Sequence, residues 1–370
     1  MELLIHEREI VEKKRKIKWN EPEIFVDNEK KGRSGHMGHA LTEFAPGKIM
    51  AFHSNCSPVR SCGHSAFGWM EYRVSEDYGQ TWGESVKFPF SWETFLDGVN
   101  TVSVEKVVTC NNGDIVAFCL MNGQEKEICC EPWDCPMTVI SKDGGKTWEK
   151  PVLFSEYKGR IYDAVYHKGV IYALEFCNDA TTHFCGNKPE HVYRLFQSTD
   201  EGKSFEEVCV VPFADTIGRA YGNMIFTEKE ELIIYAYNLH DEENMDYIAS
   251  KDYGKTWGES KKSYVANKIR NPQVGILDGQ YILHGRAGES EGGKGSFVIY
   301  TSANGIDWDE GTILVKDLRP ACFYSENLTV TLPNGKQKML VKYSENYHIG
   351  AVAGKWGQVN SMMATIESLD

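Results

Sequence analysis

Three arginines begin segments of the chain that otherwise look alike. Arg160, Arg219 and Arg270 each stand at the start of a short apolar run. A guanidinium group presents a planar fork of N–H donors, which matches the two oxygens of a carboxylate. Because the arginines hold the same place in successive segments, we expect them to point toward one ligand. Arg286 follows the second apolar run of its segment and is expected to reach the same place. Asp163 could act as a catalytic acid there or could simply pair with these arginines.

Histidine is concentrated around the same positions. Nine of the eleven histidines precede or follow apolar runs on the side where the arginines stand: His36, His39, His53, His64, His183, His191, His240, His284 and His348. Imidazole titrates near neutral pH and can transfer protons. This distribution favours a polar site over histidines scattered through a core.

The element that must position these residues is a repeated box, S-x-D-x-G-x-T-W. Copies start at 75, 141, 198, 250 and 302, so the spacings are 66, 57, 52 and 52 residues. The copy at 198 ends in Phe205, and the copy at 302 has Asn304 in place of aspartate. Ser and Asp side chains can hold a tight turn through hydrogen bonds, and Gly adopts a backbone conformation that other residues avoid. The aromatic residue anchors the turn by burial. Such periodicity indicates a repeat architecture with one supersecondary unit per copy.

Four short apolar runs surround each box, and a sixth unit near the C-terminus keeps the runs without a box. Short, apolar, turn-bounded runs are typical of strands. Six four-stranded units that close radially predict an all-β fold, a six-bladed β-propeller, over one domain at residues 1–370. We expect the segment around Ile24 to Val26 to complete the last blade. Chain direction reverses at each turn, so the boxes share one face and the arginines and histidines lie at the opposite face.

Boxes in five successive blades resemble those of the sialidase (neuraminidase) superfamily, over nearly the whole chain. The segment Phe323-Tyr324-Ser325 is similar to the stretch in which that family has its nucleophilic tyrosine, assisted by a glutamate. Tyrosine-using sialidases depart from the usual two-carboxylate pattern. Where the family opens its first blade with Arg-Ile-Pro, this chain has the sequence from His36 to His39. Residues 54–68 have no aspartate for the acid/base role, and the family's fourth-blade glutamate is replaced around Tyr221.

The resemblance implies a glycoside hydrolase of sialidase-like fold that acts on an acidic sugar. Tyr324 would be the nucleophile or acid, and a histidine would move the proton that the missing aspartate carries in the family. The candidate catalytic residues are Tyr324, His36, His39, His64 and Asp163, and the candidate substrate-binding residues are Arg60, Arg160, Arg219, Arg270, Arg286, Tyr221 and His284.

Two other functions stay open on the sequence. One is β-elimination from a uronate, in which an arginine neutralises the carboxylate and His or Tyr removes the adjacent proton. The other is a non-catalytic propeller that binds carbohydrate by stacking aromatic side chains on sugar faces. Its candidate aromatic residues are Trp69, Trp92, Trp133, Tyr221, Tyr324 and Tyr347.

Composition limits the partners. The formal net charge is −13 and no long basic stretch occurs, which argues against nucleic acid as a partner. No apolar run is long enough for a membrane span or a secretory signal. The eleven cysteines have neither disulfide-framework nor zinc-ligand spacing. We therefore expect a cytoplasmic protein without cofactor or metal, although a mature secreted form would have a similar sequence.

Overall fold

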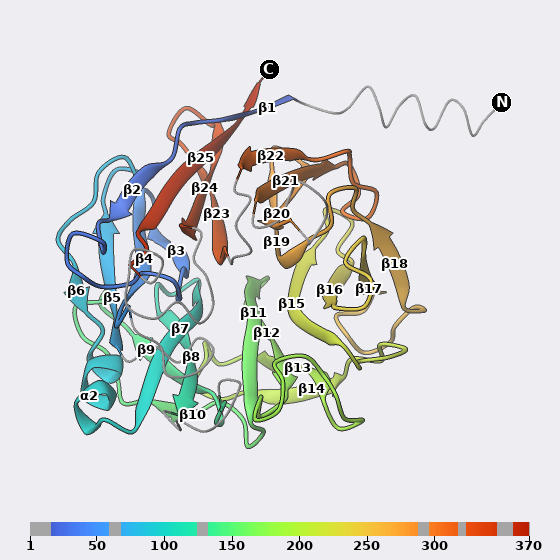
Figure 1. The fold of residues 1–370 in the computed structure, drawn as a ribbon, viewed down its shortest axis with the longest axis horizontal. Coiled ribbons are helices and arrows are strands. Elements are labelled where there is room, and N and C mark those ends of the chain that lie inside the picture. The colour runs from blue at the N-terminus through green and yellow to red at the C-terminus, as the bar shows by residue number, and fades with distance from the viewer. Residues whose placement is uncertain are drawn as a thin grey trace.

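The computed structural model describes residues 16–58, 68–123, 132–287, 296–316, 323–345 and 358–369. Their strands form five four-stranded sheets and one five-stranded sheet, arranged around a central axis (Figure 1). The predicted six-bladed β-propeller is thus confirmed.

Each of the first five blades is built from four antiparallel strands in chain order. They are β3 (Leu41–Ala45), β4 (Lys48–Cys56), β5 (Gly68–Ser75) and β6 (Val86–Lys87) in blade 1; β7 (Asn100–Thr109), β8 (Ile115–Gly123), β9 (Met137–Ser141) and β10 (Val152–Leu153) in blade 2; β11 (Gly159–His167), β12 (Val170–Cys177), β13 (Val192–Ser198) and β14 (Glu206–Val210) in blade 3; β15 (Arg219–Phe226), β16 (Leu232–Asn238), β17 (Asn244–Ser250) and β18 (Lys261–Tyr264) in blade 4; and β19 (Arg270–Leu277), β20 (Gln280–Arg286), β21 (Phe297–Ser302) and β22 (Thr312–Val315) in blade 5.

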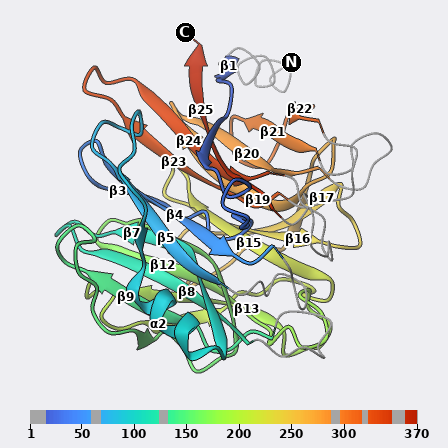
Figure 2. The same cartoon turned by 60° about the vertical axis from the view of Figure 1, so that its left-hand side comes forward.

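The sixth blade joins the two ends of the chain. It contains β23 (Ser325–Thr331), β24 (Gln337–Ser344) and β25 (Ser361–Leu369), and β25 also pairs with β1 (Lys16–Trp19) and β2 (Glu23–Val26). In both ribbon views β1 runs beside β25 (Figures 1 and 2). This pairing holds the ring shut through backbone hydrogen bonds between the beginning and the end of the chain.

Burial follows the distance of a strand from the axis. All residues of β15 and β16 are buried, whereas β14 and β18 are largely exposed. Inner strands have a neighbouring blade on each face, so their sequences are continuous apolar runs and not alternating ones. The buried apolar side chains of the described residues group into clusters that each bridge adjacent blades, for example blades 1 and 2 around Phe52 and Val104. The core is therefore a ring of interfaces between blades.

The boxes fasten one blade to the previous one. In the fourth-blade box, Ser250 Oγ accepts a hydrogen bond from the Gly254 amide at 2.8 Å and donates to Asp252 at 2.9 Å. Gly254 has φ of 92°, and a Cβ there would lie 2.4 Å from Leu195 in blade 3. In the same way, Trp148 of the second-blade box packs on Phe88, which follows β6 of blade 1, at 4.9 Å between ring centroids.

Replacing Ser250 by alanine tests the turn. Ser250 is buried, and its hydroxyl group holds both Gly254 and Asp252, so Ser250→Ala should lower the free energy of unfolding by about 1–2 kcal/mol. Chemical denaturation measures this. Thr256→Ser is the matched control, because Ser204 makes the equivalent bonds in the third-blade box, and it should change stability little. Equal stability of Ser250→Ala and wild type would contradict this role.

One element does not follow from the strand pattern. The helix α2 (Pro89–Asp97) lies between blades 1 and 2, with a proline at its start and Gly98 in a left-handed conformation at its end. Its Trp92 packs edge-on against Trp69 at 4.9 Å between ring centroids. Within the described part of the chain, no helix has the length and apolar character needed to cross a membrane.

Candidate active site

A small polar cavity of about 40 Å³ lies on the axis at the face where the first strands begin. This is the face away from the boxes, as the strand directions predict. It is lined by Met37, Gly38, His39, Glu105, Lys106, Arg160, Tyr162, Tyr221, Asn271, Gln273, Tyr324, Ser325 and Glu326. Such a volume holds a few water molecules or one substituent of a sugar ring. Four residues selected from the sequence meet here, namely Tyr324, Tyr221, Arg160 and His39.

Irregularities in the first strands bring several of these side chains to the cavity. The pairing register shifts between Val104 and Lys106, between Ile161 and Asp163, between Ala220 and Gly222, and between Arg270 and Gln273. A bulge inserts a residue and redirects its side chain. The residues at these shifts that line the cavity are Glu105, Tyr162, Tyr221 and Asn271. Tyr221 and Asn271 have φ of 44° and 55°, a strained left-handed backbone of the kind that gathers at functional sites.

The phenol of Tyr324 lies among aromatic and cationic groups. Its hydroxyl oxygen is 3.4 Å from that of Tyr221, and both residues are buried. The guanidinium carbon of Arg160 lies 5.9 Å from the centre of the Tyr324 ring. A nearby cation favours the ionised form of a phenol, whereas burial disfavours it.

Glu105 is a functional candidate that the sequence analysis missed. Its Oε2 accepts a hydrogen bond from Nε of Arg160 at 2.9 Å. Its Oε1 is buried and has no hydrogen-bond partner among the described residues. A carboxylate with one oxygen held and the other unpartnered is suited to accept a proton. The sequence signal was weak, because Glu105 lies inside an apolar run and reaches the axis only through the bulge.

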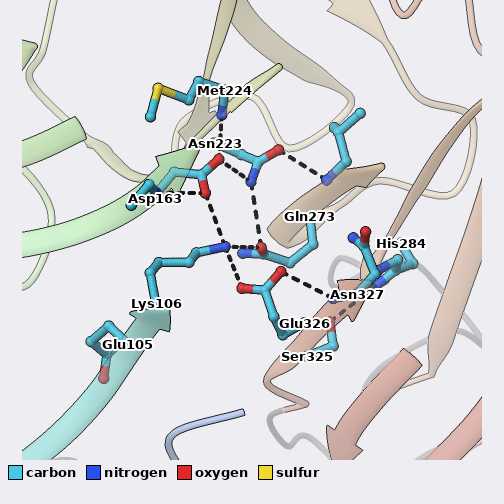
Figure 3. A network of polar contacts seen from close by, with 12 residues as sticks. Glu105, Lys106, Asp163, Asn223, Met224, Gln273, His284, Ser325, Glu326 and Asn327 are labelled. Atoms are coloured by element: carbon cyan, nitrogen blue, oxygen red, sulfur yellow. Dashed lines mark hydrogen bonds and ion pairs between the residues drawn. The ribbon is translucent and has the colours of Figure 1, made fainter. Parts of the chain in front are cut away.

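A network of polar contacts centred on Lys106 lies beneath the cavity, close to the axis (Figure 3). Lys106 is buried and forms ion pairs with Asp163, at 3.2 Å, and with Glu326. It also donates to Oε1 of Gln273 at 2.8 Å. Asp163 Oδ2 accepts hydrogen bonds from the side-chain amide of Asn223 and from the backbone N–H of Met224, both at 2.7 Å. Blades 2, 3, 4, 5 and 6 all contribute to this network.

Burial and the neighbouring charges act in opposite directions on this network. Burial disfavours the charged form of Lys106, but Asp163 and Glu326 outweigh burial and raise its pKa. Burial raises the pKa of Glu326, and Lys106 offsets part of that effect. Asp163 was expected to be catalytic; the structure instead uses its carboxylate to anchor Lys106 and two backbone or amide donors, outside the cavity that contains Tyr324.

The histidines divide into one cavity residue and several supporting ones. His39 lines the cavity. His36 is fully buried, does not line the cavity, and its Nδ1 lies 2.9 Å from Ser34 Oγ. His284 lies behind β23, with Ser325 Oγ at 3.0 Å from Nδ1 and Asn327 Nδ2 at 3.0 Å from Nε2. Burial, with Lys106 second, lowers the pKa of His284 to about 3, so this imidazole is neutral and supports the strand that follows Tyr324.

The arginines do not form one clamp. Arg160 is paired with Glu105, and Arg219 is held by Asp246 at 2.7 Å and Asp215 at 3.2 Å, outside the cavity. Arg219 was expected to bind the ligand, and the structure places it in ion pairs away from this cavity. Arg270 and Arg286 are partners across β19 and β20. Neither lines the cavity.

Aromatic rings separate Arg270 from the cavity. Its guanidinium lies over the rings of Phe184 and Tyr237, at 5.0 and 5.6 Å, and both rings pack on Tyr221. It is thus one aromatic layer from the site. Arg60 and His64 lie outside the described residues.

A larger cavity of about 540 Å³ occupies the box end of the axis. It shares Lys106 and Glu326 with the small cavity, and its walls include Thr42, Val107 and Asp163. The lysine network therefore separates two axial spaces. Among the described residues no three His, Cys, Asp or Glu side chains are grouped as metal ligands.

The buried Glu175 in β12, close to Arg160 in the adjacent strand β11, should make the stability of the fold depend on pH. It is fully buried, and burial raises its pKa to about 8, with partial offsets from Ser155 and Arg194. Above the usual pKa of 4.5 the unfolded chain ionises this acid while the folded chain does not, so wild-type stability should fall as pH rises from 5 to 8.5. Glu175→Gln should remove roughly 2–4 kcal/mol of that fall, measured by urea denaturation at each pH. Identical pH slopes for both proteins would contradict the assignment.

Comparisons with known proteins agree with this architecture. The BNR/Asp-box repeat model matches residues 139–150, which include the second box. No curated protein matches the chain.

Among solved structures, the chain is similar to a protein of unknown function from Dyadobacter fermentans DSM 18053, with 13% identity, a TM-score of 0.68, and coverage of 95% of this chain and 99% of that one. The K499G mutant of NanB sialidase from Streptococcus pneumoniae has 11% identity and a TM-score of 0.63, over 95% and 70% of the two chains. The intramolecular trans-sialidase from Ruminococcus gnavus has 10% identity and a TM-score of 0.60, over 92% and 96%. This chain therefore carries the Asp-box repeat on the six-bladed β-propeller fold that sialidases share.

Proposed function

We propose that this protein is a glycosidase that cleaves an acidic sugar at the axial cavity. The observation that carries the proposal is the buried hydroxyl group of Tyr324, which shares one polar cavity with Arg160, Glu105 and Tyr221. In this arrangement the Tyr324 oxygen attacks the anomeric carbon while the glycosidic bond breaks and the leaving alcohol takes a proton from water. Water then attacks the anomeric carbon of the tyrosyl intermediate, which releases the sugar and restores the phenol. Glu105, through its unpartnered Oε1, is the base that receives the phenolic proton.

Cationic groups near the cavity suit a carboxylate-bearing substrate. Arg160 is already paired with Glu105, so a ligand carboxylate there would have to share the guanidinium. Arg270 lies one aromatic layer away, and Arg286 faces it across the strands of blade 5. The small cavity accepts one substituent, so we place the rest of the sugar above it, on the face where Arg270 and Phe184 lie.

Elimination from a uronate is a second candidate, and one observation favours it. The hydroxyl group of Tyr324 lies 3.4 Å from another phenol hydroxyl, that of Tyr221. A tyrosine pair beside Arg160 could remove the proton next to a carboxylate that the arginine neutralises.

The aromatic side chains give less support to a purely carbohydrate-binding role. Trp133 is buried, and Trp69 and Trp92 pack against each other, so these three rings are not open platforms for a sugar face. Tyr347 lies outside the described residues.

The test is a screen of acidic glycosides with two readouts on each substrate. Released sugar supports hydrolysis, and a rise in the ultraviolet absorbance of an unsaturated uronate supports elimination. Binding without either product would favour the carbohydrate-binding role and overturn the enzyme proposal. No binding and no product across sialosides and uronides would overturn the acidic-sugar proposal as a whole.

A further inference from the structure

We propose that Lys342 is a positioning residue for His39. It donates a hydrogen bond to Nδ1 of His39, so the imidazole keeps its proton on Nε2 and presents that N–H to a ligand carboxylate in the axial cavity. The ligand part of this inference rests on the proposed function, whereas the tautomer part does not. His39 would thus be a fixed hydrogen-bond donor and not the proton shuttle that the sequence suggested.

The contact lies at the junction of blades 6 and 1. Lys342 is in β24, and His39 comes just before β3. Nζ of Lys342 is 2.8 Å from Nδ1 of His39, and Lys342 is 0% exposed. His39 is 5% exposed and lines the axial cavity, whereas Lys342 does not line it. The lysine is therefore placed behind the imidazole, on the side away from the cavity.

Lys342 differs from the other buried lysine on the axis. Lys106 has two carboxylate partners, but across the described segments no carboxylate forms an ion pair with Lys342. The nitrogen Nζ of Lys342 also lies 5.3 Å from the centre of the Phe25 ring. A buried lysine without an anion is costly to the fold, and an apolar residue of similar length would fill the space at lower cost. The hydrogen bond to His39 is the interaction that such a residue would lose.

Hydrogen-bond chemistry then fixes the tautomer. Burial lowers the pKa of Lys342 well below its usual value. Charged or neutral, the lysine amine carries N–H groups, and in the proposed arrangement it donates one of them to Nδ1, which accepts. Burial first, and the charge of Lys342 second, lower the pKa of His39 well below its usual value. A backbone hydrogen bond with His36 opposes them, and the charges of His36 and His53 add smaller lowering effects. A neutral imidazole that accepts at Nδ1 carries its proton at Nε2.

The other ring nitrogen of His39 is unpartnered. Nε2 is buried and has no hydrogen-bond partner among the described residues. His39 lines the cavity and its Nδ1 is held by Lys342, so Nε2 is the ring nitrogen left for a ligand. A neutral N–H donor backed by a lysine suits an anionic oxygen, and a carboxylate is the anionic group of the proposed substrate.

The tautomer is tested without any substrate. In the free protein labelled with ¹⁵N-histidine, we expect the His39 signals to show protonated Nε2, unprotonated Nδ1 and no titration between pH 6 and 8.5. The signals are assigned by their loss in His39→Gln. In Lys342→Met we expect the tautomer preference to be lost. Protonated Nδ1 in wild type, or an unchanged pattern in Lys342→Met, would overturn the positioning role.

The ligand part is tested by kinetics on the acidic glycoside identified in the screen. Lys342→Met should weaken binding of the acidic sugar about ten- to a hundredfold, seen mainly in KM. His39→Gln keeps an N–H donor near the position of Nε2 and should retain more activity than His39→Ala. Lys338→Met is the matched control. Lys338 lies on the same strand, opposite Glu367 of β25, and its replacement should leave KM and kcat as in wild type.

These results separate the two proposals. An altered tautomer in Lys342→Met with unchanged KM and kcat would overturn the ligand role of His39. If wild type acts on no acidic glycoside, the proposed function fails, and the spectra of wild type still decide the tautomer. If Lys342→Met does not fold, the wild-type spectra and the comparison of His39→Gln with His39→Ala remain decisive.

Discussion

Tyr324→Phe should lower kcat on the acidic glycoside by at least about a thousandfold while leaving substrate binding nearly unchanged. The substitution removes one oxygen atom, and that oxygen is the proposed nucleophile. The ring stays in place among Tyr221 and Arg160, so the shape of the cavity is kept. Steady-state kinetics and equilibrium binding measured on the same preparation give the two quantities.

Tyr235→Phe is the matched control for this substitution. Tyr235 is fully buried, and its hydroxyl group donates to the carbonyl of Gly305 at 2.8 Å, between blades 4 and 5. Its loss should cost stability and leave kcat unchanged. Turnover retained by Tyr324→Phe on every acidic glycoside that wild type cleaves would remove Tyr324 from the reaction. A similar loss of kcat in both variants would indicate a general effect on folding.

Lys106→Met should destabilise the protein by about 3–5 kcal/mol. Removing the ammonium group leaves Asp163 and Glu326 buried close together without a cation. Because the network joins five blades, we expect the loss to appear in the cooperative unfolding of the whole ring and not in one blade. Chemical denaturation at neutral pH measures it.

Two further variants control for the change of side chain. Lys48→Met removes an ion pair with Glu76 at the surface and should alter stability by less than about 1 kcal/mol. Adding Glu326→Gln to Lys106→Met should recover part of the loss, because one of the uncompensated charges disappears. A Lys106→Met variant as stable as Lys48→Met would show that the axial ion pairs contribute nothing measurable.

The lysine network also explains why the site can be small and polar at the centre of an apolar ring. Lys106 and Glu326 line both axial cavities and form the partition between them. The partition holds the first strands of blades 2 and 6 together just below Tyr324. These ion pairs therefore help to set the position of the proposed nucleophile.

The scaffold could be predicted from the sequence because its causes are local. Each box is a run of seven or eight residues in which Ser250, Asp252 and Gly254, or their equivalents, make a turn by themselves. Repetition of that turn, with apolar runs between copies, is sufficient to indicate blades. Arg160 was found because it stands at the start of a first strand, and the first strands of a propeller meet at the axis. Tyr324 was found through the resemblance of its segment to the sialidase stretch with the nucleophilic tyrosine.

Helix α2 and the bulges could not be found in the same way. The helix from Pro89 to Asp97 sits in one inter-blade connection and does not repeat. The bulges at Glu105 and Tyr221 depend on how each first strand pairs with the second, and a one-residue change in register redirects a side chain. The sequence shows only a glutamate and a tyrosine within apolar runs.

The charge pairs were likewise decided by packing between blades. The sequence determined the six repeating units, the turns that define the box face and the identity of the residues that begin each first strand. Only the tertiary structure decided that Arg219 binds Asp246, that Asp163 anchors Lys106, and that Lys342 stands behind His39. The physical reason is distance along the chain: turns are made by residues a few positions apart, whereas Lys342 and His39 are 303 positions apart and meet only when the ring closes.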